Sequence, residues 1–231
     1  MSTSFIKQLA AMHSVPAYLL LCTCLISTAM VSAFWFGWAL WKIALLIVIA
    51  WLPLFVLKTA AIYRQYQWLA YFFILVVTQG AHFLEHLAQM IQIHVLGLSG
   101  LQARGIFGML DIEWVHFIWN SWVLLFAVLL VFLFRKNPWL WVLLVVSMWH
   151  ELEHVYIMSV FLRTGHVGTP GLLARGGAIW GGLPLTRPDL HFIYNLIEEA
   201  LLIIAYVSQI KLLQSSAQRG ATPQVSVIEA S

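Results

Sequence analysis

Six histidines and several glutamates stand out in this chain of 231 residues because they lie inside long apolar stretches. Two segments share the spacing His-x-x-Glu-His, and each is followed by one more histidine further along the chain. These residues are His82, Glu85, His86 and His116, then His150, Glu153, His154 and His191. Residues three and four apart share one face of an α-helix, so each segment presents its imidazoles and carboxylate together. Imidazole and carboxylate groups in this arrangement are typical ligands of zinc, iron and copper.

The two groups belong to a longer internal match. The matching pairs of segments are 82–86 with 150–154, 100–105 with 171–176, and 116–120 with 191–195. The offsets are 68, 71 and 75 residues, so the second copy is slightly longer in each connection. Three matches in one order predict a tandem duplicated helical hairpin. Two copies with the same topology are expected to be related by a pseudo-twofold axis along the membrane normal, with a four-helix site between them.

The composition places these motifs in a membrane. Hydrophobic residues make up 62% of the chain and charged residues 9%, and the mean hydropathy is +0.89. Soluble domains usually carry about 25% charged residues, so a water-soluble globule is excluded. Since a span needs about 20 apolar residues and irregular backbone is excluded from lipid, we predict an all-α polytopic bundle of about six transmembrane helices. The expected spans are 15–36, 40–60, 67–94, 112–134, 138–163 and 189–210.

The chain is expected to divide into four parts. They are a two-helix scaffold (1–66), the two hairpins (67–134 and 138–210) and a disordered polar tail (211–231). Six spans put both termini on one side, where seven Lys and Arg fall, against five on the other. The positive-inside rule therefore favours cytoplasmic termini, which we place in a bacterial inner membrane with the site near the outer face. The lipid bilayer is the expected partner, and no basic cluster indicates nucleic-acid binding.

The few charges gather at one depth of the helices, where six of the nine acidic residues join the six histidines. A charged group there costs about 2.5–3.5 kcal/mol on insertion scales and normally finds a partner in the bundle. Protonation, pairing with Arg104 and Arg175, or bound metal can neutralise the acids, and we favour metal. The predicted ligands are His82, Glu85, His86, His116, His150, Glu153, His154, His191 and Glu198. Asn120 and Asn195 follow their histidines by one turn and are predicted to form hydrogen bonds around the ligands.

Three imidazoles from each copy indicate two metal ions. This ligand pattern resembles the coupled dinuclear copper centres of tyrosinase and haemocyanin, although the resemblance covers no continuous stretch of chain. Glu113 and Glu151 each begin a Glu-x-x-His sequence, similar to the motif of ferritin-like di-iron carboxylate proteins, where Glu85 and Glu198 would be the additional carboxylates. Either resemblance implies redox chemistry with dioxygen. We predict a membrane oxidoreductase with two iron or copper ions, acting with dioxygen or in electron transfer on a lipid-soluble or periplasmic small molecule, with a redox partner.

Other functions stay open. Residues 150–154 fit the His-Glu-x-x-His pattern of zinc metalloproteases, with Glu151 as general base, and residues 82–86 fit the inverted pattern. A zinc-bound water would then hydrolyse an ester or amide. The duplication aligns Glu151 with Phe83, so a zinc hydrolase does not explain the symmetry and ranks second. Bis-His ligation of b-haem, or a proton or metal-ion transport path, are further alternatives.

Two glycine-rich connections carry Arg104 and Arg175 on the same side as the site. Glycine permits close approach and positive φ, so each connection can fold over the polar layer as a lid. We therefore predict that these two arginines act at the site in catalysis, together with Glu113 and Glu151. The alternative is that the arginines pair structurally with glutamates or with lipid phosphate.

Overall fold

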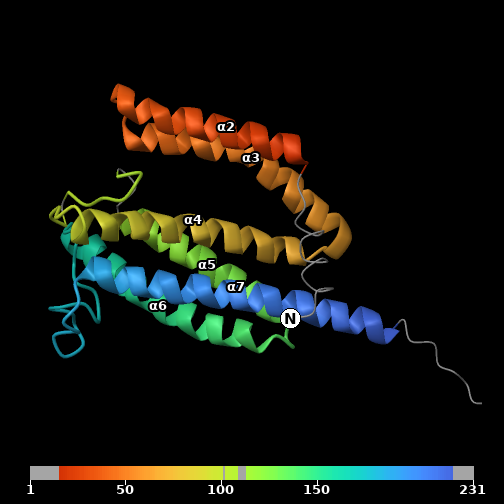
Figure 1. Cartoon of the computed structure of the whole chain (residues 1–231). Helices are drawn as coiled ribbons and strands as arrows, with labels where there is room; N and C mark the ends of the chain where they lie inside the picture. Colours follow the sequence, from red (N-terminus) through yellow and green to blue (C-terminus); the bar gives the residue numbers. More distant parts are fainter. Residues whose placement is uncertain (1–15, 101, 109–112, 221–231) are drawn as a thin grey trace, which may run out of the picture.

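The computed structural model describes residues 16–100, 102–108 and 113–220, which form an all-helical arrangement (Figure 1). The helices are α2 (Ala17–Ser32), η1 (Ala33–Phe36), α3 (Leu40–Tyr66), α4 (Leu69–His94), α5 (Glu113–Leu133), α6 (Pro138–Thr164) and α7 (Arg187–Gly220). The helices lie at the expected spans, but α3 runs to Tyr66, six residues past its predicted end, and α7 continues into the stretch predicted as a disordered tail. The helix extends there because its apolar face continues, with Leu213 packed against the bundle core. The end of the predicted tail, 221–231, and the start of the predicted scaffold, 1–15, lie outside the described residues.

Three segments of the described chain are long and apolar enough to cross a membrane, which indicates a membrane protein. They are Ala17–Phe36, Leu40–Tyr66 and Glu113–Leu133. The helices α4, α6 and α7 carry most of the histidines and glutamates, whose polarity lowers their hydropathy. Crossing by these three helices, and thus a count of six spans, stays a prediction.

The last four long helices form one bundle, and α2 and α3 lie together along one side of it (Figure 1). Within the bundle α5 packs against α6 and α4 packs against α7. The connection between α4 and α5 and the connection between α6 and α7 lie at the same end of the bundle (Figure 1). The histidines of α4 and α6 lie in the parts of these helices that lead toward that end.

The apolar core fills the half of the bundle away from these connections. It includes Phe72 and Leu75 near the start of α4, Leu130 near the end of α5, Leu143 near the start of α6, and Leu202 in α7. These side chains are fully buried. Most of the buried apolar side chains therefore lie in one half of the bundle, while the buried histidines and glutamates lie in the other beside a smaller apolar cluster of Ala174, Leu190 and Tyr194.

The start of α6 is fixed by a local motif. Asn137 is the N-cap residue, and its side chain accepts a hydrogen bond from the backbone N–H of Trp139. Pro138 occupies the first helical position, where its missing N–H has no helical partner to lose. The Asn137 amide also donates to the carbonyl oxygen of Ala205 on α7 at 2.8 Å. This contact sets the position of α6 along α7, and with it the depth of the α6 histidines.

Candidate metal centre

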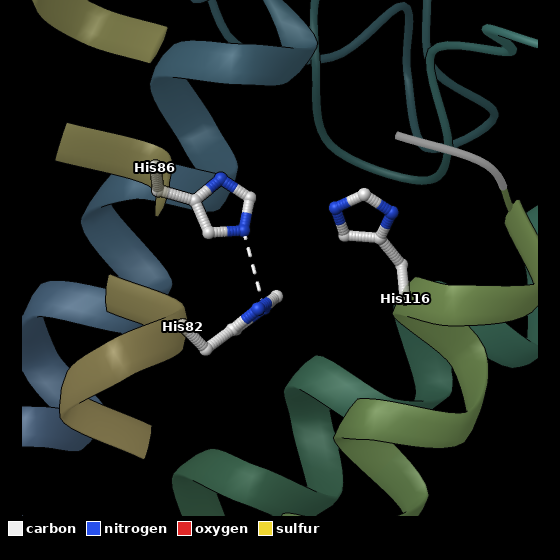
Figure 2. A group of neighbouring side chains, drawn as sticks. All are labelled: His82, His86 and His116. Atoms are coloured by element: carbon white, nitrogen blue, oxygen red, sulfur yellow. Dashed lines mark hydrogen bonds between the residues drawn. The ribbon is translucent and has the colours of Figure 1, made fainter. Parts of the chain in front are cut away.

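Three buried imidazoles from α4 and α5 point toward one space (Figure 2). His82 and His86 lie one turn apart on α4, and their Nε2 atoms are 3.2 Å apart. His116 comes from α5, and one ring nitrogen from each of the three histidines lies within 4.8 Å of the others. Two nitrogens bonded to one ion at about 2.0–2.1 Å and a tetrahedral angle lie about 3.3–3.4 Å apart. The spacing of this first triad therefore suits a single metal ion.

A second triad repeats this arrangement on α6 and α7. The Nε2 atoms of His150 and His154 are 3.3 Å apart, and His191 of α7 completes a group whose ligand nitrogens all lie within 4.8 Å of one another. All three residues are buried, with exposed fractions of 1%, 1% and 4%. The two triads thus place the six predicted histidine ligands in two groups of three.

The two triads contact each other through their rings. The rings of His116 and His154 are stacked with centroids 6.0 Å apart, and those of His86 and His191 have centroids 6.4 Å apart. Each of these pairs joins one histidine of the first triad to one of the second. Ions bound at the triads would therefore be close neighbours inside one polar layer.

The two predicted asparagines lie beside the triads but bond to the backbone. The Asn120 amide donates to the carbonyl oxygen of His116 at 2.9 Å, and the Asn195 amide donates to that of His191, also at 2.9 Å. The side-chain oxygen of Asn195 accepts from Nε2 of Gln79 at 2.9 Å. The asparagines therefore brace the histidine-bearing turns of α5 and α7.

Glu198 contacts the second triad from outside. Its Oε2 lies 3.2 Å from Nδ1 of His150, while Nε2 of His150 faces His154. The same oxygen accepts from Nε2 of Gln79 at 3.2 Å, and Oε1 of Gln79 accepts from Nε1 of Trp119 at 3.1 Å. A carboxylate on the far nitrogen of a ligating histidine fixes the tautomer and orientation of the ring. The structure places Glu198 in that position relative to His150.

Gln79 is a site residue that the sequence did not single out. It is fully buried and joins α5 to α7 by the hydrogen bonds to Trp119, Asn195 and Glu198. The available signal was an amide three residues before His82 in an otherwise apolar run, where it shares a helical face with that histidine.

Glu85 and Glu153, predicted as ligands, accept hydrogen bonds from the two glycine-rich connections. Oε1 of Glu85 accepts from the N–H groups of Ile106 and Phe107 at 2.9 and 3.0 Å. Oε1 of Glu153 accepts from the N–H of Leu172 at 2.8 Å. Within the described residues, the groups spaced for one ion contain histidines alone. Metal ligation by Glu85, Glu153 and Glu198 stays a prediction.

Two glycines make these loop contacts sterically feasible. Gly105 has φ +71° and Gly171 has φ +81°, and a Cβ at either would collide with the carboxylate of Glu85 or Glu153, respectively. Positive φ and close approach both favour glycine here. The matched Gly-rich segments therefore pack directly on the matched glutamates. Leu101 of the first segment lies outside the described residues.

Arg187 pairs with a glutamate of the site. Its guanidinium donates to both carboxylate oxygens of Glu113, with Nη1 2.7 Å from Oε1. The backbone N–H of Gly168 donates to the same Oε1 at 2.9 Å. No motif in the sequence singled out Arg187, although its place at the start of the last helix was a signal. Bidentate pairing fixes the geometry of both side chains.

The other predicted catalytic residues are placed differently. Arg175 is exposed and donates to the carbonyl oxygen of Pro184 at 3.1 Å. Arg104 is also exposed and lies on the wall of a cavity at the loop end of the bundle. Glu151 faces α5, where it accepts from the hydroxyl of Ser121 at 2.6 Å.

Comparison with protein-family models, curated proteins and solved structures gives no match to this chain. The similarity to dinuclear copper and di-iron proteins is therefore one of ligand pattern.

Proposed function

We propose that this protein is an integral membrane metalloprotein that binds two transition-metal ions, one at each histidine triad. The observation that carries the proposal is the convergence of six buried imidazoles from four helices into two groups of three. A neutral imidazole at membrane depth is less costly than a charge, but it still requires a partner. A metal ion gives three imidazoles one shared partner, and three protein ligands with one open position are the typical ligand set of a catalytic metal site.

We further propose that the two hairpins are copies of one unit. The alignment equates α4 with α6 and α5 with α7, so the packing of α4 on α7 corresponds to the packing of α6 on α5. The ring pair of His86 and His191 likewise corresponds to that of His154 and His116. A pseudo-twofold axis passing between the triads accounts for both correspondences.

We propose that the chemistry is redox rather than hydrolytic. Iron and copper both accept imidazole ligands, and two neighbouring redox ions can exchange two electrons with dioxygen or with a redox partner. The zinc hydrolase alternative needs Glu151 to act as a base at the metal. Its carboxylate instead accepts from Ser121 on the neighbouring helix, which supports the redox proposal. We also propose a bacterial inner membrane with cytoplasmic termini and the triads near the outer face.

Metal analysis of the detergent-purified protein tests this proposal. We expect two ions of copper or iron per chain, with an absorption or paramagnetic spectrum. H86A and H154A should each lose one ion, because each removes one ligand from one triad. H166A is the matched control, since His166 is exposed on the connection before α7, and it should retain both ions.

Three results would count against parts of the proposal. Two zinc ions and no redox metal would favour the hydrolase, and a Soret band would favour haem. Metal at trace level in the purified protein, with none taken up on addition of copper, iron or zinc, would overturn metal binding altogether.

A further inference from the structure

A cavity of about 560 Å³ reaches both histidine triads from the loop end of the bundle. His86 and His116 of the first triad line it, and so does His191 of the second. The rest of its wall comes mainly from the two connections and the start of α7, and it includes Arg104, Gly168 and Arg187. A molecule in this cavity can therefore contact the imidazoles of both triads at once.

The charged groups on the cavity wall favour an anion. Among the described residues of the wall, the guanidinium groups of Arg104 and Arg187 lie together with the carboxylate of Glu113. The carboxylate is bonded in a bidentate manner by Arg187 and also by the backbone N–H of Gly168. The histidines and Gln89 add further polar groups to the wall.

The backbone around Arg104 is held firmly. The amide of Gln89 on α4 donates to the carbonyl oxygen of Ala103 at 2.9 Å. Gln92, one turn further on, both donates to and accepts from the backbone of Gly105, each at 2.8 Å. Ala103 is also fully buried, so the backbone of Arg104, between Ala103 and Gly105, has a fixed position at the cavity wall. Such preorganisation lowers the entropic cost of binding.

A second cavity offers a contrast. It has a similar volume but lies between α3 and α4, is lined mainly by apolar residues such as Phe55, Val56 and Ile74, and includes no histidine. An apolar molecule would suit that cavity, but it would not contact the triads there. The cavity at the triads has its walls in the loops, which a water-soluble molecule can reach.

We infer that the cavity between the two connections binds a small water-soluble anion whose charge is shared by two or three oxygen atoms, with Arg104 at one end and the two triads at the other. A guanidinium matches the geometry of such an anion through paired N–H donors. This inference rests on the proposed function, because it identifies the class of molecule that the metal-bearing site receives. It favours a water-soluble substrate over a lipid-soluble one.

Titration with nitrite tests the inference. Nitrite is added to the purified, metal-loaded protein and to the metal-free protein, and binding is followed by calorimetry and by the metal spectrum. We expect one nitrite per chain, a change in the metal spectrum, and affinity at least about tenfold weaker in R104Q, since a hydrogen bond to a charged group is lost. R104K should recover part of the affinity, because it retains the charge without the paired donors.

R175Q is the matched control. Arg175 is the counterpart of Arg104 in the second copy, is also exposed, and is not part of the cavity wall. R175Q should bind nitrite as the unaltered protein does, and both variants should keep two metal ions. No nitrite binding to metal-loaded protein, or equal losses in R104Q and R175Q, would overturn the inference. Nitrite binding without a spectral change would show that the anion does not reach the triads.

The two proposals fail in different ways. If the metal-binding proposal is wrong, the unaltered protein binds no metal, whether or not it binds nitrite. If the anion site is wrong, the protein has its normal metal content but shows no nitrite binding that depends on Arg104.

Discussion

Replacing Glu198 should weaken one metal site and leave the other unchanged. Its Oε2 lies 3.2 Å from Nδ1 of His150, and both side chains are 1% exposed. In the alignment that equates His116 with His191, the counterpart of Glu198 is Val123. The first triad therefore has no carboxylate at the corresponding position. The two sites are therefore expected to differ in affinity although their histidines match.

The size of the effect follows from this contact. Removing a group that orients a ligating histidine typically costs about 10–100-fold in metal affinity, or about 1.4–2.7 kcal/mol. E198Q retains an oxygen that can accept from His150 and Gln79 but loses the charge, so we expect the lower end of this range. E198V reproduces the residue of the other copy and removes the oxygen atoms that lie beside Nδ1 of His150 and Nε2 of Gln79, so we expect the upper end.

Competition with a chelator measures this difference. Metal-loaded protein is titrated and the number of ions released at each chelator concentration is recorded. The unaltered protein sets the two reference affinities, and the variants should show one unchanged and one weakened step. E151Q is the control. Glu151 follows His150 in the sequence and is also buried, but its carboxylate accepts a hydrogen bond from the hydroxyl of Ser121.

Equal weakening of both ions, or no weakening of either, would refute the reasoning. A loss far beyond the stated range at one site would show instead that Glu198 is itself a ligand, as the sequence predicted. Circular dichroism of each variant should match the unaltered protein, which separates a local effect from misfolding.

Three further predictions concern the surroundings of the triads. G171A should lower the free energy of unfolding by about 2–4 kcal/mol, because it adds strain at positive φ and displaces the Glu153 carboxylate from Leu172. G165A is the control: Gly165 has φ +70° but lies in open space, so this change should lower the free energy of unfolding by about 1 kcal/mol. Denaturant unfolding in detergent compares the two, and equal losses would show that the Glu153 contact contributes nothing. R187Q should cost about 3–5 kcal/mol by leaving Glu113 without its bidentate partner, while R163Q, on the exposed end of α6, should change stability by no more than about 0.5 kcal/mol. An E113Q/R187Q double variant tests the pairing, because additive losses would contradict it. Removing the metal with a chelator should lower the melting temperature of the unaltered protein but not that of an H86A/H154A double variant, since only the native form of an intact site gains stability from the ion. A matching fall in the double variant would mean that the chelator acts elsewhere.

The sequence predicted the helices well because their signals are local. Apolar runs of membrane length gave the approximate bounds of α2 to α7, and His-x-x-Glu-His spacing gave the helical face that each segment presents. The convergence of six histidines followed from their equal depth in alternating helices. The extension of α7 beyond residue 210 was missed because Leu213 gains its packing from the bundle, not from its neighbours in sequence.

The roles of the polar residues were harder to predict, because they depend on which atoms meet across helices. Glu85 and Glu153 have the spacing of ligands, yet the structure gives each a bond to a loop whose path the sequence does not specify. Arg104 and Arg175 occupy matching positions, but only Arg104 lines the cavity at the triads. Arg187 and Gln79 have no motif, and their contacts with Glu113 and Glu198 join residues far apart in the chain.

The sequence by itself determined that the chain is helical and apolar, that its ionisable groups share one layer, and that two segments of it match. These are properties of composition, periodicity and order along the chain. The tertiary structure decided how the imidazoles divide into two triads, which carboxylate lies behind which ring, and which arginine lines the cavity. Those outcomes depend on contacts of a few ångströms between different helices, and a single helix does not specify the rotation or depth of its neighbour.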